Sequence, residues 1–394
     1  MGTSEGSRAP GRGRPGWFRA VGLPSGGWTL LDPEDQPFLL RAVHGVRATV
    51  DGDDGVPPRP AATLLRGWGF NADGVGGDGA GAEDGLPFLC AVGAGVGSAW
   101  LTAPGLRLPD VFAPEWPRLV AARVEEVCAP RAEDRQLIGW VADADLDWAQ
   151  AVPGGGPSLL QRCLSLEPSF AAYHAAWEFV LALHGGRLDA VSRAWGVPLA
   201  NKEVVRDLTR SERGLATRGY LRDEAQWSRE YARRYFGVTG ATLRAADPNH
   251  LLFGCRFASP AGSAVLAECA YPAVDVAMPH WTELPLPGPL GTHPVVAGDL
   301  RWNLPSLLAP GTGRERRLTT VERMLRRARA ALDRLAAQRH VVGYAWAAWQ
   351  DVPSEQPPFG SGLLHAGGGE AREHTELLAE FNRRLQARVP SSSP

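Results

Sequence analysis

Short apolar runs alternate with segments of helical periodicity along most of the chain. The apolar runs favour β-branched and aromatic residues and are bounded by Gly, Pro or Asp, which predicts buried strands. Eight such strands are expected, near residues 38–46, 69–75, 85–95, 137–148, 250–257, 273–281, 293–300 and 340–349. Residues 17–43 read as an opening hairpin that turns at Gly26-Gly27 and runs into the first of these strands.

Helical spacing of apolar residues fills most of the intervals between the strands. It predicts helices over residues 114–130, 158–166, 170–184, 223–246, 319–338 and 372–386. Strands that alternate with helices indicate an α/β fold, and eight of them favour a single (β/α)8 TIM barrel with a short N-terminal hairpin. A doubly wound open sheet is the alternative, but no GxGxxG motif follows the first strand.

The ends of the chain differ from its centre. Residues 1–16 are polar, Gly-rich and basic, and residues 389–394 are mostly Ser and Pro, so both are expected to be disordered tails. Residues 17–388 are expected to form one barrel domain. Because no apolar run follows the basic start, a cytoplasmic protein is expected, or a secreted one if the start codon is misassigned.

The amino-acid composition argues against several classes of function. The 394 residues carry a formal net charge of -2, which offers no electrostatic basis for binding nucleic acid or a membrane surface. Five scattered cysteines without a CxxC pair indicate neither a zinc site nor a disulfide framework. No metal ion and no cofactor is therefore expected.

Carboxylates gather where a barrel would place its active site. The stretch "LIGWVADADLDW" ends in Asp143, Asp145 and Asp147, which share one face if the strand continues through them. Asp299 closes the apolar run "HPVVAGDL". The carboxyl ends of barrel strands carry the catalytic residues, and a pair of carboxylates is what glycoside hydrolysis requires.

Several segments, in order, resemble the agarase-like glycoside hydrolases, which are retaining TIM-barrel enzymes. The resemblance runs from Trp17 to Leu385 and rests on "LPDVFAPEWPRLVAARVEEVCAP", "LIGWVADADLDW", "ADPNHLLFGCRF", "PAVDVAMPHW", "HPVVAGDL" and "VVGYAWAAWQDVP". It implies that Asp145 and Asp299 occupy the positions of the two catalytic Glu residues. It also implies that Ala144 stands where the family has a sugar-contacting Asn.

These replacements leave two functions open. Each Glu-to-Asp change shortens the side chain by about 1.5 Å, which predicts slow hydrolysis of a β-linked galactan or a related saccharide. The alternative is an inactive barrel that binds a glycan or a protein partner. Under either reading, the substrate-binding residues are expected to be Asp143, Arg256, His280, Trp281, Trp346 and Trp349.

Overall fold

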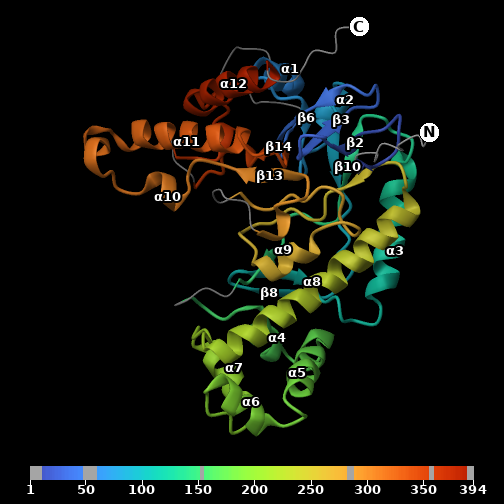
Figure 1. Ribbon diagram of the computed structural model, residues 1–394, viewed down its shortest axis with the longest axis vertical. Helices are drawn as coiled ribbons and strands as arrows, with labels where there is room; N and C mark the ends of the chain where they lie inside the picture. The colour runs from blue at the N-terminus through green and yellow to red at the C-terminus, as the bar shows by residue number, and fades with distance from the viewer. Residues whose placement is uncertain (1–10, 48–59, 151–154, 282–287, 355–358, 388–394) are drawn as a thin grey trace, which may run out of the picture.

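The structure is a computed structural model that describes residues 11–47, 60–150, 155–281, 288–354 and 359–387. Most of the predicted N-terminal tail and the whole predicted C-terminal tail lie outside these residues. Within them, the chain forms a mixed α/β fold around a curled sheet of seven parallel strands (Figure 1).

The strands of this sheet follow the order β12-β10-β7-β6-β5-β14-β13. Their bounds are β5 Leu40–Val43, β6 Ala72–Asp73, β7 Phe88–Ala91, β10 Leu137–Val141, β12 Leu251–Leu252, β13 Val295–Leu300 and β14 Val341–Trp346. Each lies within a segment that the sequence predicts to be a strand. All adjacent pairs are parallel, so the carboxyl ends of the strands lie at one edge of the sheet.

The remaining predicted strand, residues 273–281, lies between the two edge strands β12 and β13. The backbone N–H of Asp275 donates to the carbonyl oxygen of Leu252 at 2.8 Å, and that of Trp281 donates to Gly298 at 2.7 Å. Isolated parallel bridges join Ala277 to Val295 and His280 to Gly298. This segment therefore spans the space between β12 and β13 through backbone hydrogen bonds.

Side chains from alternate strand positions fill the inside of the curled sheet. The inner cluster includes Leu40, Leu89, Ile138 and Val296, all at most 3% exposed. Gly343 is required where β14 lies against β5, because a Cβ atom there would lie 2.4 Å from the Leu40 carbonyl oxygen. The inner face of the curled sheet is thus a packed core.

The described residues contain helices that lie beside the sheet and helices that lie away from it (Figure 1). They are α1 Ala61–Gly67, α2 Ala80–Glu83, α3 Trp116–Cys128, α4 Leu159–Leu164, α5 Ala171–Leu183, α6 Leu188–Trp195, α7 Glu203–Arg210, α8 Arg218–Ala246, α9 Ser263–Glu268, α10 Pro305–Leu308, α11 Thr320–Ala336 and α12 Arg372–Gln386. The six helices predicted from periodicity are all present. Helix α11 begins at a capping box, in which Thr319 and Glu322 satisfy each other's backbone N–H groups.

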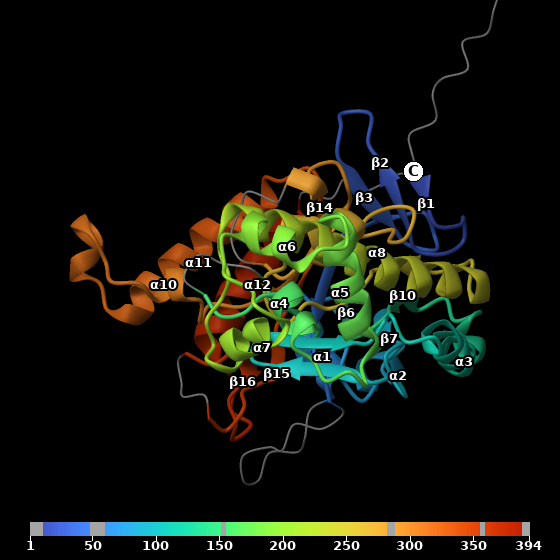
Figure 2. The ribbon, with the colours of Figure 1, turned by 90° about the horizontal axis from the view of Figure 1, so that it is seen from below.

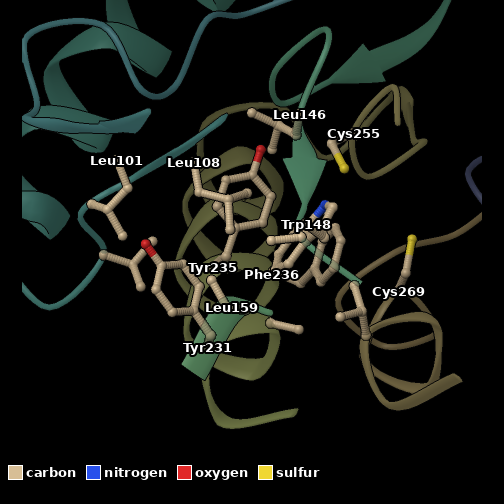
Figure 3. Close-up of a cluster of buried hydrophobic side chains, with 14 of the residues drawn as sticks. Leu101, Leu108, Leu146, Trp148, Leu159, Tyr231, Tyr235, Phe236, Cys255 and Cys269 are labelled. Atoms are coloured by element: carbon tan, nitrogen blue, oxygen red, sulfur yellow. The ribbon is translucent and has the colours of Figure 1, made fainter. Parts of the chain in front are cut away.

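Helices α4 to α7 form a helical lobe beside one end of the long helix α8 (Figures 1 and 2). A small antiparallel sheet separates the lobe from the strand ends; it contains β8 Trp100–Ala103, β9 Leu106–Pro109 and β11 Asp147–Trp148. Trp148 stacks on Phe236 of α8 with ring centroids 5.8 Å apart, among the buried side chains of Figure 3. This packing fixes the loop before β11 relative to α8.

The N-terminal residues form a further antiparallel sheet, with β1 Gly11–Arg12, β2 Arg19–Gly22, β3 Trp28–Leu31 and β4 Pro37–Phe38. Strand β1 pairs with β2, and the Arg14 guanidinium donates to the Asn249 side chain at 2.9 Å. Residues 11–16 are therefore ordered, in contrast to the tail expected there. The local sequence carries no apolar pattern, and these residues are ordered by pairing and by arginine contacts with distant segments.

A last strand pair, β15 Ala348–Gln350 and β16 Gly362–Leu364, follows β14.

Candidate active site

Strand β10 ends at Val141, before the acidic residues that follow it. The three carboxylates therefore do not share one face, in contrast to the sequence expectation. Asp143 is 3% exposed and accepts hydrogen bonds from the Gly95 N–H at 2.9 Å and the Tyr235 hydroxyl at 2.7 Å. Asp147 lies in β11 and accepts from Ser259. The turn at 142–146 sends each carboxylate in its own direction.

Asp145 lies on this turn, on the exposed side of the strand ends. Its side chain is 57% exposed, and Oδ1 lies 3.2 Å from Nη1 of Arg256. Its backbone has a φ of 58°, a left-handed conformation that Asp adopts more readily than most residues. Arg107 donates from Nη1 to the carbonyl oxygens of Ala144 and Asp145, both at 3.1 Å, which supports this conformation.

Asp299 lies in β13 and is 2% exposed. Its φ is also 58°, so both carboxylates singled out by the resemblance lie on left-handed backbone. Oδ1 accepts from Arg256 through Nη2 at 2.6 Å and Nε at 3.2 Å. Oδ2 accepts from Arg301 and lies 3.4 Å from Nε2 of His280. Strain of this kind gathers at functional sites, where the surrounding contacts maintain it.

These contacts decide the ionisation of Asp299. Burial alone would raise its pKa, but the hydrogen bond with His280 and the charges of Arg256 and Arg301 hold the pKa well below its usual range. Asp299 is therefore a carboxylate at neutral pH. Asp143 has the opposite balance: burial raises its pKa to about 6, against the lowering effect of its hydrogen bonds with Gly95 and Tyr235.

Arg256 joins the two candidate catalytic residues. Its guanidinium contacts Oδ1 of Asp145 and Oδ1 of Asp299, and its side chain is 16% exposed. The outer nitrogens of a guanidinium are about 2.3 Å apart, so the two carboxylate oxygens lie at most about 8 Å from each other. That bound admits the spacing of either retaining or inverting glycosidases. The sequence does not show that one arginine would bridge both residues.

The predicted tryptophans are largely buried. Trp346 and Trp349 are 0% and 2% exposed, and Trp281 is 5% exposed. Trp346 packs edge-on against Trp302, with ring centroids 4.9 Å apart. In this conformation Trp346 and Trp349 present almost no surface to a sugar. Of the predicted site residues, the structure brings together Asp145, Asp299, Arg256 and His280. Asp143 is buried below the turn at 142–146, and the tryptophans lie in the core.

Two arginines lie at the site that were not among the substrate-binding residues predicted from the sequence. Arg301 follows β13 and contacts both Asp299 and, at 3.3 Å, His280. Arg107 lies on β9 and supports the turn at Asp145. The position of Arg301, two residues after Asp299, could have indicated its role, since residues two apart on a strand point the same way. Arg107 offers no such signal, because its contact depends on the pairing of β9 with β11.

Within the described part of the chain, no group of three or more His, Cys, Asp or Glu side chains is placed to hold a metal ion. The five cysteines are unpaired, and four of them are buried. None of the helices in the described ranges has the length and hydrophobicity needed to cross a membrane.

No protein-family model and no curated protein sequence matches the chain. Its fold is similar to that of solved glycoside hydrolases. The agarase AgWH50C superposes with a TM-score of 0.65 at 17% identity, over 97% of this chain and 66% of that one. BpGH50 gives a TM-score of 0.66 at 16% identity, over 98% and 85%.

A β-galactosidase from Rahnella sp. R3 gives a TM-score of 0.51 at 13% identity, over 90% of this chain and 56% of that one. The chain spans about two thirds of the length of AgWH50C. At these identities the similarity establishes a shared fold, and function has to be argued from the site itself.

Proposed function

We propose that the protein is a carbohydrate-active member of the glycoside hydrolase fold that hydrolyses a β-linked galactan or a related oligosaccharide slowly. The observation that carries the proposal is the pairing of Asp145 and Asp299 through the guanidinium of Arg256. Solved structures of similar fold are named as agarases and a β-galactosidase, which supports a galactose-containing substrate.

The proposal includes a closed (β/α)8 barrel formed by residues 17–388 as one domain. Segment 275–281 would be the missing strand between β12 and β13. Its hydrogen bonds to Leu252 on one side and to Gly298 on the other support this closure. Asp145 then follows the fourth strand and Asp299 lies at the end of the seventh, at the carboxyl-terminal mouth, where barrel enzymes carry their active sites.

The two carboxylates differ in the way that hydrolysis requires. Asp145 is exposed at the strand ends, where it can contact a bound saccharide, so it is assigned as the acid that protonates the leaving oxygen. Asp299 is ionised, so it is assigned as the base that takes a proton from the attacking water. The water then bonds to the anomeric carbon as the glycosidic C–O bond breaks, with inversion.

The contacts of Asp299 explain why turnover would be slow. A carboxylate offers about four acceptor positions, and three N–H donors from Arg256 and Arg301 occupy most of them. A carboxylate that already accepts these hydrogen bonds has few acceptor positions left with which to take a proton from a water molecule. The same observation favours a second candidate function, in which the site binds a glycan without turnover.

The experiment is to incubate the protein with agaro-oligosaccharides, β-galactosides and β-glucosides and to follow the anomers by NMR. Slow release of the inverted anomer is expected, and it should be lost in both Asp145→Asn and Asp299→Asn. Asp207→Asn, on the exposed surface of α7, is the matched control and should keep the wild-type rate. Fast turnover with retention would refute the assignment of Asp299.

Binding without turnover has a separate signature. Calorimetry would then show oligosaccharide binding with no anomer released over days. If the protein neither binds nor cleaves any of these saccharides, the carbohydrate proposal itself fails.

A further inference from the structure

A cavity of about 440 Å³ is lined by residues that include neither Asp145 nor Asp299. It is bounded by α2, by β7 and by Arg131 at the end of the 3-10 turn Ala129–Arg131. Ala72 of β6 packs into the inner core, so the next residue, Asp73, points to the outer face. Volumes of this size accommodate small organic ligands.

Asp73 is the buried polar group of this cavity. The residue is 2% exposed, and its Oδ1 atom has no hydrogen-bond partner among the described residues. Burial raises the pKa of Asp73 to about 7, and the backbone N–H of Gly81 opposes the shift. A buried carboxylate oxygen without a donor has lost its hydration and gained no hydrogen bond, so native proteins seldom retain one without a use.

The loop around Asp73 is so tightly packed that two of its glycines, Gly77 and Gly81, have no room for a side chain. A Cβ atom at Gly81 would lie 2.8 Å from Oδ2 of Asp73, and one at Gly77 would lie 2.2 Å from the carbonyl oxygen of Val46. Backbone contacts this close fix the shape of the loop. The cavity is therefore a defined feature of the fold.

The charges that line the cavity are mainly negative. Asp73, Asp78 and Glu83 contribute carboxylates, and Arg131 contributes one guanidinium. The Arg131 guanidinium lies 5.8 Å from the centre of the Phe88 ring. The remaining titratable group on the wall is Cys90, a half-buried thiol whose pKa burial raises. The wall therefore favours a cation with N–H donors.

We infer that this cavity is a second binding site, for a small organic ammonium ion whose N–H group donates to Oδ1 of Asp73. Asp78 and Glu83 add electrostatic attraction from the rim. A metal ion fits less well, because no three metal-binding side chains converge in the described parts of the chain. The cavity shares no lining residue with the proposed hydrolytic site, since neither Asp145 nor Asp299 nor Arg256 lines it.

The test compares two probes of equal length, 1,4-diaminobutane and 1,4-butanediol, by calorimetry and thermal unfolding at pH 8 and constant ionic strength. The diamine is expected to bind and to raise the Tm, and the diol is not. Asp73→Asn keeps the shape but removes the charge, and it should weaken diamine binding about tenfold or more. Asp207→Asn is the control and should bind as the wild type does.

A pH series on the unmodified protein keeps the inference testable even if Asp73→Asn fails to fold. With the pKa of Asp73 at about 7, its ionised fraction rises about tenfold from pH 6 to pH 8, and diamine affinity should rise by about the same factor. Equal binding by Asp73→Asn, equal binding of the diol, or no diamine binding at pH 8 would each overturn the inference.

Discussion

Replacement of Arg256 by Met should destabilise the protein strongly, because it removes one of the two guanidiniums that neutralise Asp299. Methionine retains the length and the apolar stem of the side chain, so the change tests the charge. Asp299 is 2% exposed and Arg256 is 16% exposed, so the carboxylate is buried and the guanidinium is largely shielded from solvent. Breaking such a pair costs about 3–5 kcal/mol, and the lower end applies here because Arg301 still contacts Oδ2.

The loss should depend on pH in a specific direction. The pKa of Asp299 is lowered in the folded protein, so its ion pairs stabilise the fold fully above the unfolded pKa of about 3.9. That stability is lost as the pH falls through the lower folded pKa. The difference between wild type and Arg256→Met should therefore be about 3 kcal/mol at pH 7 and smaller below pH 4.

Urea unfolding at pH 7 and pH 3 measures both quantities. The matched control is Arg229→Met: Arg229 is 63% exposed, and loss of its pair with Glu268 should cost less than about 1 kcal/mol. The double variant Arg256→Met with Asp299→Asn should regain much of the loss, since it no longer buries an underpaired charge. The reasoning fails if Arg256→Met costs no more than Arg229→Met, or if the loss is the same at both pH values.

Three further predictions concern other parts of the fold. Trp346→Ala should cost about 3–5 kcal/mol in urea unfolding, because Trp346 is fully buried; a loss no larger than that of Tyr271→Ala, at a residue 57% exposed, would contradict it. Deletion of residues 1–16 should lower the Tm relative to deletion of 1–10, because it removes β1 and the Arg14 contact; equal Tm values would argue against ordered packing of 11–16. Asp143→Asn should flatten the pH dependence of stability between pH 4 and 6, because the wild-type carboxyl, with its pKa raised to about 6, destabilises the fold as it ionises; an unchanged slope would refute this.

Much of the architecture follows from local sequence. Apolar runs such as Leu137–Val141 predict strands, because burial on both faces of a parallel sheet requires apolar residues at every position. The capping box of Thr319 and Glu322 and the apolar spacing after it predict α11. The resemblance to agarase-like enzymes points to Asp145 and Asp299, and the structure brings both to one guanidinium. These features depend on residues close in the chain or on their order.

Tertiary structure alone decided the electrostatics of the site. The alternation of acidic residues predicts a fourth strand that continues through Asp147. In the structure, a turn supported by Arg107 interrupts this strand, because β9 pairs with β11 there. Trp346 lies in the core and packs against Trp302, although its position at a strand end led us to expect a contact with a sugar. Whether Asp299 ionises depends on Arg256, 43 residues earlier in the chain, and only the curl of the sheet brings the two together. Sequence order carries no such distances, and the free energy of a charge depends on its distances to other charges and to water.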